Sequence, residues 1–305
     1  MKLHHVIEAQ QFDRSTLAHL FEVAEKMEQV VQEGGIADYH NRIMATLFYE
    51  PSTRTRFSFE TAMHRLGGRV ISTENAAEFS SVSKGETLED TIRTMNGYAD
   101  VIVLRHSEVG AAKRAAAVSQ VPVINAGDGV GQHPTQALLD LYTIRKELGK
   151  IDGLRVAMVG DLAQGRTVRS LAYLLSKFQD IRIYFVAPPL LKMKEDILAH
   201  LREHNVWYAE ETVLEKVLPE VDVVYQTRVQ KERFGDLAEY EKCRGVYIIN
   251  QACLRLMKPT AIIMHPLPRL DEITMDVDQD RRAAYFRQAQ NGLYVRMALL
   301  TLVLG

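Results

Sequence analysis

Short apolar runs alternate with longer amphipathic stretches along almost the whole chain. Four such runs, at residues 43–49, 69–73, 100–105 and 121–126, are each followed by a stretch with apolar side chains at helical spacing. Strands that alternate with helices predict a parallel β-sheet whose two faces are covered by helices. The pattern therefore places the first half of the chain in the α/β class.

The alternation starts again after a long predicted helix at residues 134–148. We expect the later apolar runs to form a second set of strands, at residues 154–160, 181–187, 221–226, 246–250 and 261–265. An α/β fold with two doubly wound parallel-sheet domains, joined by long helices, is the result. Gly149 and Gly153 lie between the two sets, and glycine permits backbone angles that other residues resist. We expect a hinge there.

The C-terminal segment has leucine, tyrosine and methionine at helical spacing and no strand after it. We therefore expect it to pack back on the first domain. The predicted domains are residues 1–133 plus 285–305, and residues 149–284, with 134–148 as the interdomain helix.

Composition narrows the class of protein. Hydrophobic residues make up 47% and charged residues 25% of the 305 positions, which is typical of a soluble globular protein. The formal net charge is only −2, so we expect no nucleic acid and no membrane surface as a partner. No run approaches the roughly 18 apolar residues that span a bilayer. Cys243 and Cys253 lack the spacing of a zinc site or a disulfide framework. The N-terminal residues lack the apolar stretch of a signal peptide. Both observations predict a cytoplasmic location.

Candidate chemistry lies at the junctions between strands and helices. Ligands of open α/β sheets bind beyond the carboxyl ends of the strands, where helix N-termini offer unpaired N–H groups to anions. The junction at residues 50–56 reads Glu-Pro-Ser-Thr-Arg-Thr-Arg, and Arg54 there supplies a planar charged fork. Helical spacing turns Arg56 away from Arg54, so we expect Arg56 to form a structural ion pair. A phosphate group would contact Ser52, Thr53, Arg54 and Thr55.

A second junction suggests a different function. Residues 160–167 read Gly-Asp-Leu-Ala-Gln-Gly-Arg-Thr, which differs from the P-loop pattern by arginine in place of lysine. A P-loop-like nucleotidase is therefore one hypothesis. The larger, planar guanidinium of Arg166 does not replace the compact lysine charge isosterically. Two further hypotheses are a glycine turn with a solvated arginine and an anion-binding module without turnover.

Four segments considered together point elsewhere. They read EPSTRTRFSFE at 50–60, KGETLEDT at 84–91, GQHPTQALLDL at 131–141 and MHPLPR at 264–269. In order and separation they resemble the signature segments of the carbamoyltransferases, and details of the last two are similar to the aspartate branch. The resemblance implies transfer of the carbamoyl group of carbamoyl phosphate to L-aspartate, giving N-carbamoyl-L-aspartate and phosphate in de novo pyrimidine biosynthesis. A different acceptor amino acid stays open as an alternative, and the nucleotidase as a weaker one.

The resemblance also implies a role for each matching residue. It places carbamoyl phosphate in the first domain and L-aspartate in the second. The implied catalytic residues are Arg54, Thr55, Lys84, Arg105 and His133. Carbamoyl phosphate is expected to contact Ser52, Thr53, Arg54, Thr55, Ser80, Arg105, His133, Gln136 and the backbone carbonyls of Leu267 and Pro268. L-Aspartate is expected to contact Lys84, Arg166, Arg228 and Gln230.

Partners follow from the segment that contains Ser80 and Lys84, which no predicted strand directly precedes. In the family this loop completes the active site of a neighbouring subunit, so a homotrimer with shared active sites is implied. A separate regulatory chain stays open as a further partner. No metal ion and no organic cofactor is expected, because the aspartate amine attacks once it is deprotonated and the departing phosphate can accept a proton.

Overall fold

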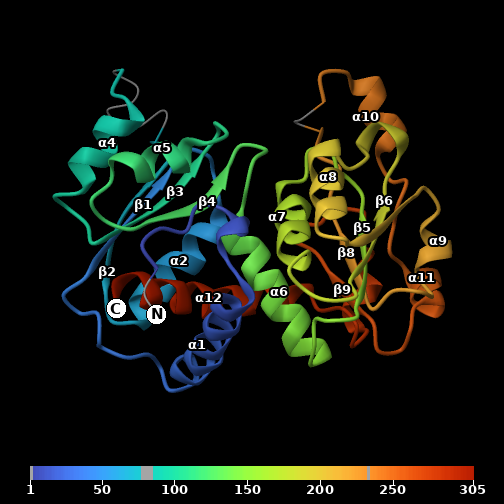
Figure 1. Cartoon of the computed structure of the whole chain (residues 1–305), viewed down its shortest axis with the longest axis horizontal. Helices are drawn as coiled ribbons and strands as arrows, with labels where there is room; N and C mark the ends of the chain where they lie inside the picture. Colours follow the sequence, from blue (N-terminus) through green and yellow to red (C-terminus); the bar gives the residue numbers. More distant parts are fainter. Residues whose placement is uncertain (1–2, 77–84, 232–233) are drawn as a thin grey trace. The chain divides into compact units, whose positions relative to one another are not determined.

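The protein forms two α/β units in the computed structural model, which describes residues 3–76, 85–231 and 234–305 (Figure 1). Residues Met1–Leu139 and Gln290–Gly305 make up the first unit, and Asp140–Ala289 make up the second. Every strand pair in both sheets is parallel. The predicted fold class, two parallel-sheet α/β domains, is confirmed.

The first unit holds a sheet of four strands in the order β2-β1-β3-β4. Because the order reverses at β1, its carboxyl end and that of β3 form the switch point at which such sheets bind ligands. The strands are β1 (Ile43–Phe48), β2 (Arg69–Glu74), β3 (Val101–His106) and β4 (Val123–Asp128). The helices are η1 (Ala9–Gln11), α1 (Arg14–Gln32), α2 (Thr53–Arg65), α4 (Leu88–Met95) and α5 (Ala111–Val118).

Helices cover both faces of this sheet: α4 and α5 lie on one face, and α1, α2 and α12 (Tyr285–Leu304) lie on the other (Figure 1). On the first face, Leu47 of β1 and Ile102 of β3 pack in one apolar cluster with Ile92 of α4 and Ala115 of α5. A strand that is buried on both faces needs apolar residues at successive positions. This explains why β1 reads as a continuous apolar run, Ile-Met-Ala-Thr-Leu-Phe.

The second unit holds a sheet of five strands in the order β7-β6-β5-β8-β9, so its switch point lies between β5 and β8. The strands are β5 (Arg155–Val159), β6 (Arg182–Val186), β7 (Trp207–Glu211), β8 (Val223–Gln226) and β9 (Ile262–Met264). The helices are α7 (Arg166–Leu175), η3 (Pro189–Leu191), α8 (Glu195–Glu203), α9 (Leu214–Val217), α10 (Leu237–Cys243), α11 (Gln251–Leu256) and η5 (Met275–Gln279).

One predicted strand is wrong and one strand is missed. Residues 246–250 form only a single bridge, between Ile249 and Ile273, and the run ends where Asn250 caps α11 through its side chain. The missed strand is β7, whose sequence Trp-Tyr-Ala-Glu-Glu has no apolar run because it pairs with β6 alone, at the edge of the sheet. Edge strands have one exposed side and tolerate polar residues, so their sequence signal is weak.

Two long helices contain the boundaries between the units. Helix α6 (Pro134–Leu148) has the predicted bounds. The chain passes from the first unit to the second within α6, after Leu139, and returns to the first unit within α12, at Gln290. Gly149 and Gly153 follow α6 with φ of 74° and 76°, the left-handed region that favours glycine.

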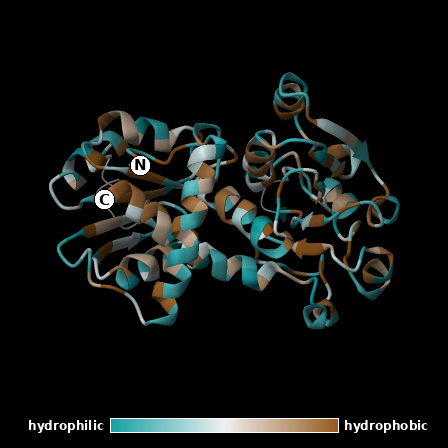
Figure 2. Cartoon of the chain, turned by 60° about the horizontal axis from the view of Figure 1, so that its bottom comes forward, coloured by the Kyte–Doolittle hydropathy of each residue, from teal (hydrophilic) through white to brown (hydrophobic). Residues whose placement is uncertain are grey.

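The helices carry both hydrophobic and hydrophilic residues (Figure 2). A helix that packs one face against a sheet and turns the other to water has this mixed composition. Among the described residues, no helix is both long and apolar enough to cross a bilayer.

Candidate functional site

The junction at residues 50–56, which the sequence predicts to bind a phosphate group, lies between β1 and α2. Ser52 is the N-cap residue of α2, yet its side chain makes no capping hydrogen bond. The backbone N–H of Ser52 instead faces Glu74 of β2, at 3.4 Å from Oε1. Helix capping therefore does not account for the Ser52 hydroxyl, which leaves it available at the N-terminal end of the helix, next to N–H groups that the helix itself does not use.

Two arginines on α2 have different environments. Arg56 forms an ion pair with Glu74 at 2.9 Å and lies 3.6 Å from Glu60, so the predicted structural ion pair is confirmed. Arg54 is exposed at the start of the helix, and no acidic partner for it is found in the described part of the chain. Desolvation by nearby protein lowers the pKa of Arg54 from its ordinary value, but an arginine stays charged at neutral pH. A charged guanidinium and a helix N-terminus at one place suit an anion.

The neighbouring strand brings a third arginine to the same edge. Arg105 pairs in register with Phe48, so it emerges beside the β1–α2 junction at the switch point. Its Nε lies 3.4 Å from Glu50 Oε2, and its terminal nitrogen donates to the carbonyl of Ala126 at 3.5 Å. These contacts hold the guanidinium at the carboxyl end of β3.

His133 and Gln136 lie at the start of α6, after β4. Both side chains are buried, with 4% and 9% of the residue exposed, which is unusual for polar residues unless they have a specific role. The His133 carbonyl accepts from the backbone N–H groups of Gln136 and Ala137 at 3.1 and 3.2 Å and so begins the helix. Those predicted residues of this unit that the structure describes thus lie along one edge of the sheet.

Asp128 fixes the loop that leads to His133, a role the sequence prediction missed. One carboxylate oxygen accepts from the Gly110 N–H at 2.7 Å, and the other accepts from the Gln132 N–H at 2.9 Å and from Asn125 Nδ2 at 3.2 Å. A buried carboxylate that receives several N–H donors holds its loop firmly. The signal in the sequence is the aspartate between two glycines, Gly127 and Gly129.

The glycine turn of the second unit is not a phosphate loop. The Asp161 N–H donates to Thr227 Oγ1 at 3.0 Å, and the Gln164 N–H donates to the Asp161 carboxylate at 2.9 Å. The N–H groups of residues 162 and 163 both donate to the Leu191 carbonyl at 3.1 Å. A phosphate loop needs its backbone N–H groups free to face the anion. Those of residues 161–164 all have protein acceptors, which argues against the nucleotidase hypothesis.

Arg166 and Arg228 follow β5 and β8, the two strands that flank the switch point of the second sheet. The strands pair with Val159 opposite Gln226, so both arginines leave the same edge. The segments that follow the two strands approach each other closely, because a Cβ at Gly160 would lie 2.5 Å from the Thr227 carbonyl oxygen. Arg166 is the first residue of α7 and is buried; Gln230 is half-buried in the loop after β8.

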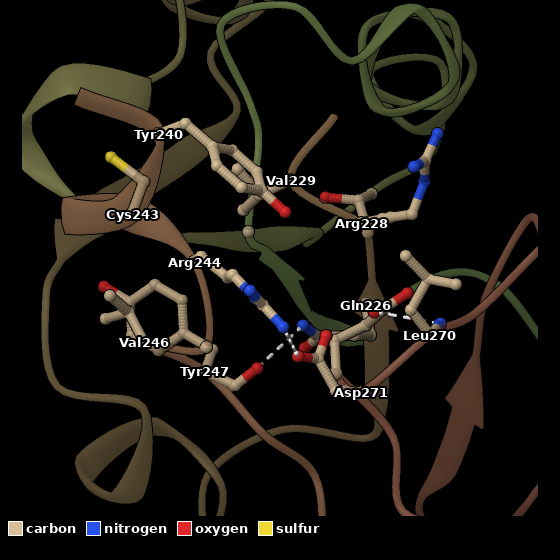
Figure 3. Close-up of a pocket in the computed structure, with 14 residues that line it drawn as sticks. Gln226, Arg228, Val229, Tyr240, Cys243, Arg244, Val246, Tyr247, Leu270 and Asp271 are labelled. Atoms are coloured by element: carbon tan, nitrogen blue, oxygen red, sulfur yellow. Dashed lines mark hydrogen bonds and ion pairs between the residues drawn. The ribbon is translucent and has the colours of Figure 1, made fainter. Parts of the chain in front are cut away.

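A pocket opens at this edge, next to Arg228 (Figure 3). Arg244 reaches Asp271 across it at 3.6 Å, while the Arg228 guanidinium extends away from that pair. Of the predicted L-aspartate residues in the described part, Arg228 lines this pocket, and Arg166 and Gln230 are not among its lining residues. Gln226 donates to the Tyr247 carbonyl at 3.3 Å and closes one wall.

The turn after β9 holds Leu267 and Pro268 in place through buried side chains. The Leu267 N–H donates to His265 Nδ1 at 2.8 Å, and His265 Nε2 contacts Glu272 Oε1 at 2.8 Å. Burial acts to raise the pKa of Glu272, but the hydrogen bond from His265 opposes it, and that pKa lies below its ordinary value. The backbone carbonyls that the sequence predicts as acceptors therefore belong to a fixed turn.

Two predicted residues, Ser80 and Lys84, lie outside the described residues. The prediction of no metal site overlooks one feature of the sequence, the His-x-x-x-His spacing of His200 and His204. These histidines and Glu203 come together on α8 in the structure.

Comparison with known proteins agrees with this geometry. Residues 4–146 match the family domain described as aspartate/ornithine carbamoyltransferase, carbamoyl-P binding domain, and residues 152–303 match the Asp/Orn binding domain. The chain is 63% identical to aspartate carbamoyltransferase 1, chloroplastic, of Pisum sativum, over 99% of this chain and 79% of the relative. It is 54% identical to the aspartate carbamoyltransferase catalytic subunit of Thermococcus gammatolerans, over 98% and 97% of the two chains.

A solved structure is also similar. The crystal structure of aspartate transcarbamoylase from Trypanosoma cruzi, in complex with carbamoyl phosphate and aspartate, superposes with a TM-score of 0.95. It is 44% identical to this chain and covers 100% of this chain and 98% of its own.

Proposed function

Since the chain belongs to the aspartate/ornithine carbamoyltransferase family, we propose that it transfers the carbamoyl group of carbamoyl phosphate to the amine of L-aspartate. The products are N-carbamoyl-L-aspartate and phosphate, as in de novo pyrimidine biosynthesis. The observation that carries the proposal lies at one edge of the first sheet. Arg54, in the first turn of α2, follows β1, and Arg105 lies at the end of the neighbouring strand β3. Relatives that are named aspartate carbamoyltransferases support the choice of acceptor.

In the first unit, the phosphate group of carbamoyl phosphate binds at the N-terminus of α2. It accepts hydrogen bonds from backbone N–H groups, from the hydroxyls of Ser52, Thr53 and Thr55, and from Arg54. Arg105 and His133, with Thr55, hold the carbamoyl oxygen and stabilise the negative charge that develops on it during attack. The carbamoyl NH2 is held by the Gln136 side chain.

In the second unit, two arginines match the two carboxylates of L-aspartate. Arg166 and Arg228 leave one edge of the sheet, with Gln230 in the same loop as Arg228. The carbonyls of Leu267 and Pro268 accept from the carbamoyl NH2. The deprotonated amine attacks the carbonyl carbon; a C–N bond forms, the C–O bond to phosphate breaks, and the departing phosphate takes up a proton. Each step uses groups of the chain or the substrates and needs no metal ion or cofactor.

One assay tests the function against its alternatives. Purified protein is mixed with carbamoyl phosphate and either L-aspartate or L-ornithine, and N-carbamoyl products and phosphate are measured. We expect N-carbamoyl-L-aspartate and phosphate in equal amounts, competitive inhibition by succinate, and no hydrolysis of ATP with Mg²⁺. Citrulline as the main product would move the chain to the ornithine branch. ATP hydrolysis without carbamoyl transfer would restore the nucleotidase hypothesis.

The assembly is a homotrimer in which Ser80 and Lys84 of one chain complete the site of its neighbour, with Lys84 also contacting L-aspartate. The family resemblance of residues 84–91 supports this part of the proposal. A separate regulatory chain would bind this trimer as a further partner. Gel filtration with light scattering of the endogenous protein tests both statements, because a trimer, a monomer and a larger mixed assembly differ in mass.

The proposed location is the cytosol. Both cysteines, Cys243 and Cys253, are free and buried, which suits a reducing compartment. The Pisum sativum relative is named chloroplastic, and plastids are the alternative to test. Fractionation of the source cells, with an antibody against the chain, decides between the two compartments.

A further inference from the structure

Three side chains that can bind a metal ion lie together at the C-terminal end of α8, and none of them belongs to the sites described above. His200 lies in the last turn, Glu203 is the last helical residue, and His204 is the C-cap residue. Each offers one ligand atom, and these atoms all lie within 4.8 Å of one another. Residues four apart lie on one face of a helix. The two imidazole rings accordingly have centroids only 4.0 Å apart.

The hydrogen bond of His204 fixes which ring nitrogen can bind a metal. His204 Nδ1 lies 2.9 Å from the backbone carbonyl of His200. A carbonyl oxygen can only accept, so Nδ1 carries the proton. The other nitrogen, Nε2, is then left with a lone pair. Metal-binding histidines commonly donate their second ring nitrogen to a backbone carbonyl in this way.

A second hydrogen bond fixes the other tautomer in His200, with the proton on Nε2. Its Nε2 lies 2.9 Å from Ser176 Oγ, and the Ser176 hydroxyl donates its single proton to the Tyr173 carbonyl at 2.9 Å. Ser176 Oγ therefore accepts from His200 Nε2–H, which leaves the lone pair on His200 Nδ1. Two independent hydrogen bonds thus hold both imidazoles in metal-binding tautomers.

Charges of both signs lie near the three side chains. Glu203 contributes a carboxylate, and the C-terminal end of a helix carries a partial negative charge. Lys177 acts against it, since its charge contributes with burial and His204 to lowering the pKa of His200.

We propose that His200, Glu203 and His204 form a binding site for a divalent transition-metal ion, with Zn²⁺ as the physiological choice. Two imidazole nitrogens and one carboxylate are a known zinc ligand set that leaves a position open. Around a tetrahedral ion at about 2.1 Å from each atom, two ligand atoms lie about 3.4 Å apart. The side chains of Glu203 and His204 are exposed, so they are free to close to that separation when the ion binds. The ion would lock the end of α8.

Calorimetric titration with ZnCl2 tests the site on untagged, full-length protein that has been stripped of metals with a chelator. We expect about one Zn²⁺ per chain. His204→Ala should lose affinity by more than the roughly 10- to 100-fold that removal of an outer partner costs. Ser176→Ala, which releases the His200 tautomer, should lose affinity within that range. Carbamoyl transfer serves as a check that both variants are folded, because neither residue has a part in it.

His4→Ala is the matched control, since His4 and His5 form another pair with ring centroids 4.0 Å apart. Its Zn²⁺ affinity should equal that of the unchanged protein. Titration with Cu²⁺, followed by electron paramagnetic resonance, should report two nitrogen ligands in the unchanged protein and one in His204→Ala. Absence of Zn²⁺ binding, loss of binding in His4→Ala, or full binding in His204→Ala would each overturn the proposal. Unchanged affinity in Ser176→Ala would overturn the role of the fixed tautomer.

Discussion

Arg54 and Arg56 lie two positions apart on α2, and helical geometry turns them about 200° from each other. One is committed to Glu74, and the other faces outward at the helix start with no acidic partner among the described residues. Helical spacing in the sequence is sufficient to predict this division. Sequence could not indicate that the Ser52 N–H faces Glu74 of β2, or that the Gly110 N–H donates to Asp128, because the partners are 22 and 18 positions apart along the chain.

Arg105 tests the stabilisation of the developing negative charge. We expect Arg105→Ala to lower kcat by about 100- to 1,000-fold, the usual cost of removing one donor to such an oxyanion. The measurement is steady-state carbamoyl transfer at saturating substrates. Arg114→Ala is the control, because Arg114 pairs with Glu89 and Glu108 at the surface, each at 3.0 Å. An unchanged kcat in Arg105→Ala, or an equal loss in Arg114→Ala, would contradict the assignment.

Arg228 tests the aspartate side. A hydrogen bond to a charged group contributes about 1.5–3 kcal/mol, so Arg228→Ala should raise the KM for L-aspartate by roughly 10- to 100-fold. The Kd of carbamoyl phosphate should stay nearly the same. Arg244 lines the same pocket but is paired with Asp271, which makes Arg244→Ala the matched control. If Arg244→Ala raised the KM as much, the pocket would bind L-aspartate through the other arginine.

At the scale of the element, the sequence predicts those helices and strands that are formed by buried apolar runs. The bounds of α6 and the central strands follow from such runs. The edge strand β7 does not, because none of its residues is fully buried and two of them carry charge. Residues 246–250 have the composition of a strand, but Ile249 finds only one bridge and Asn250 is needed as a cap. Both errors arise where pairing partners, rather than local composition, decide the structure.

A buried set of hydrogen bonds joins four elements of the second unit. Asp140 of α6 is fully buried and accepts from the Tyr225 hydroxyl of β8 at 2.7 Å and from Gln288 of α12 at 2.6 Å. Gln288 in turn accepts from the His265 N–H, after β9, at 2.9 Å. Burial and the Asp140 charge raise the pKa of Tyr225 well above its ordinary value, so the hydroxyl stays protonated and can donate.

Tyr225→Phe should therefore lower the free energy of unfolding by about 1.5–3 kcal/mol, since a hydrogen bond to a buried charge is lost and the ring is kept. Urea unfolding, followed by circular dichroism, measures the change. Tyr184→Phe is the control, because the Tyr184 hydroxyl has no hydrogen-bond partner among the described residues and its loss should cost less than about 0.5 kcal/mol. Equal stabilities of the two variants would mean that the buried set contributes nothing.

At the scale of the whole molecule, the shared site makes a prediction that a single chain cannot. Arg54→Ala and Lys84→Ala trimers should each be nearly inactive, because Arg54 acts in its own chain and Lys84 acts in its neighbour's site. Random mixing gives about three hybrid trimers in four, each with one complete site of three. After dissociation and reassociation, about a quarter of the unmutated activity should return. No recovery in trimers confirmed by sizing would mean that Lys84 serves its own chain.

The passage of the chain through α6 and α12 has a consequence for synthesis. The second unit is one continuous segment, whereas the first needs residues 290–305, which include Arg296 bonded to Ser58 at 3.0 Å and the Leu302 carbonyl bonded to the Leu3 N–H at 2.9 Å. Domains usually fold in the order in which the ribosome releases them. Here we expect the reverse. The test uses nascent chains that are arrested when residues 140–289 have left the ribosome and residues 290–305 are still in the exit tunnel. In these chains the second unit should resist protease, and the first unit should be cleaved. The part of the protein that is made first would be the part that is finished last.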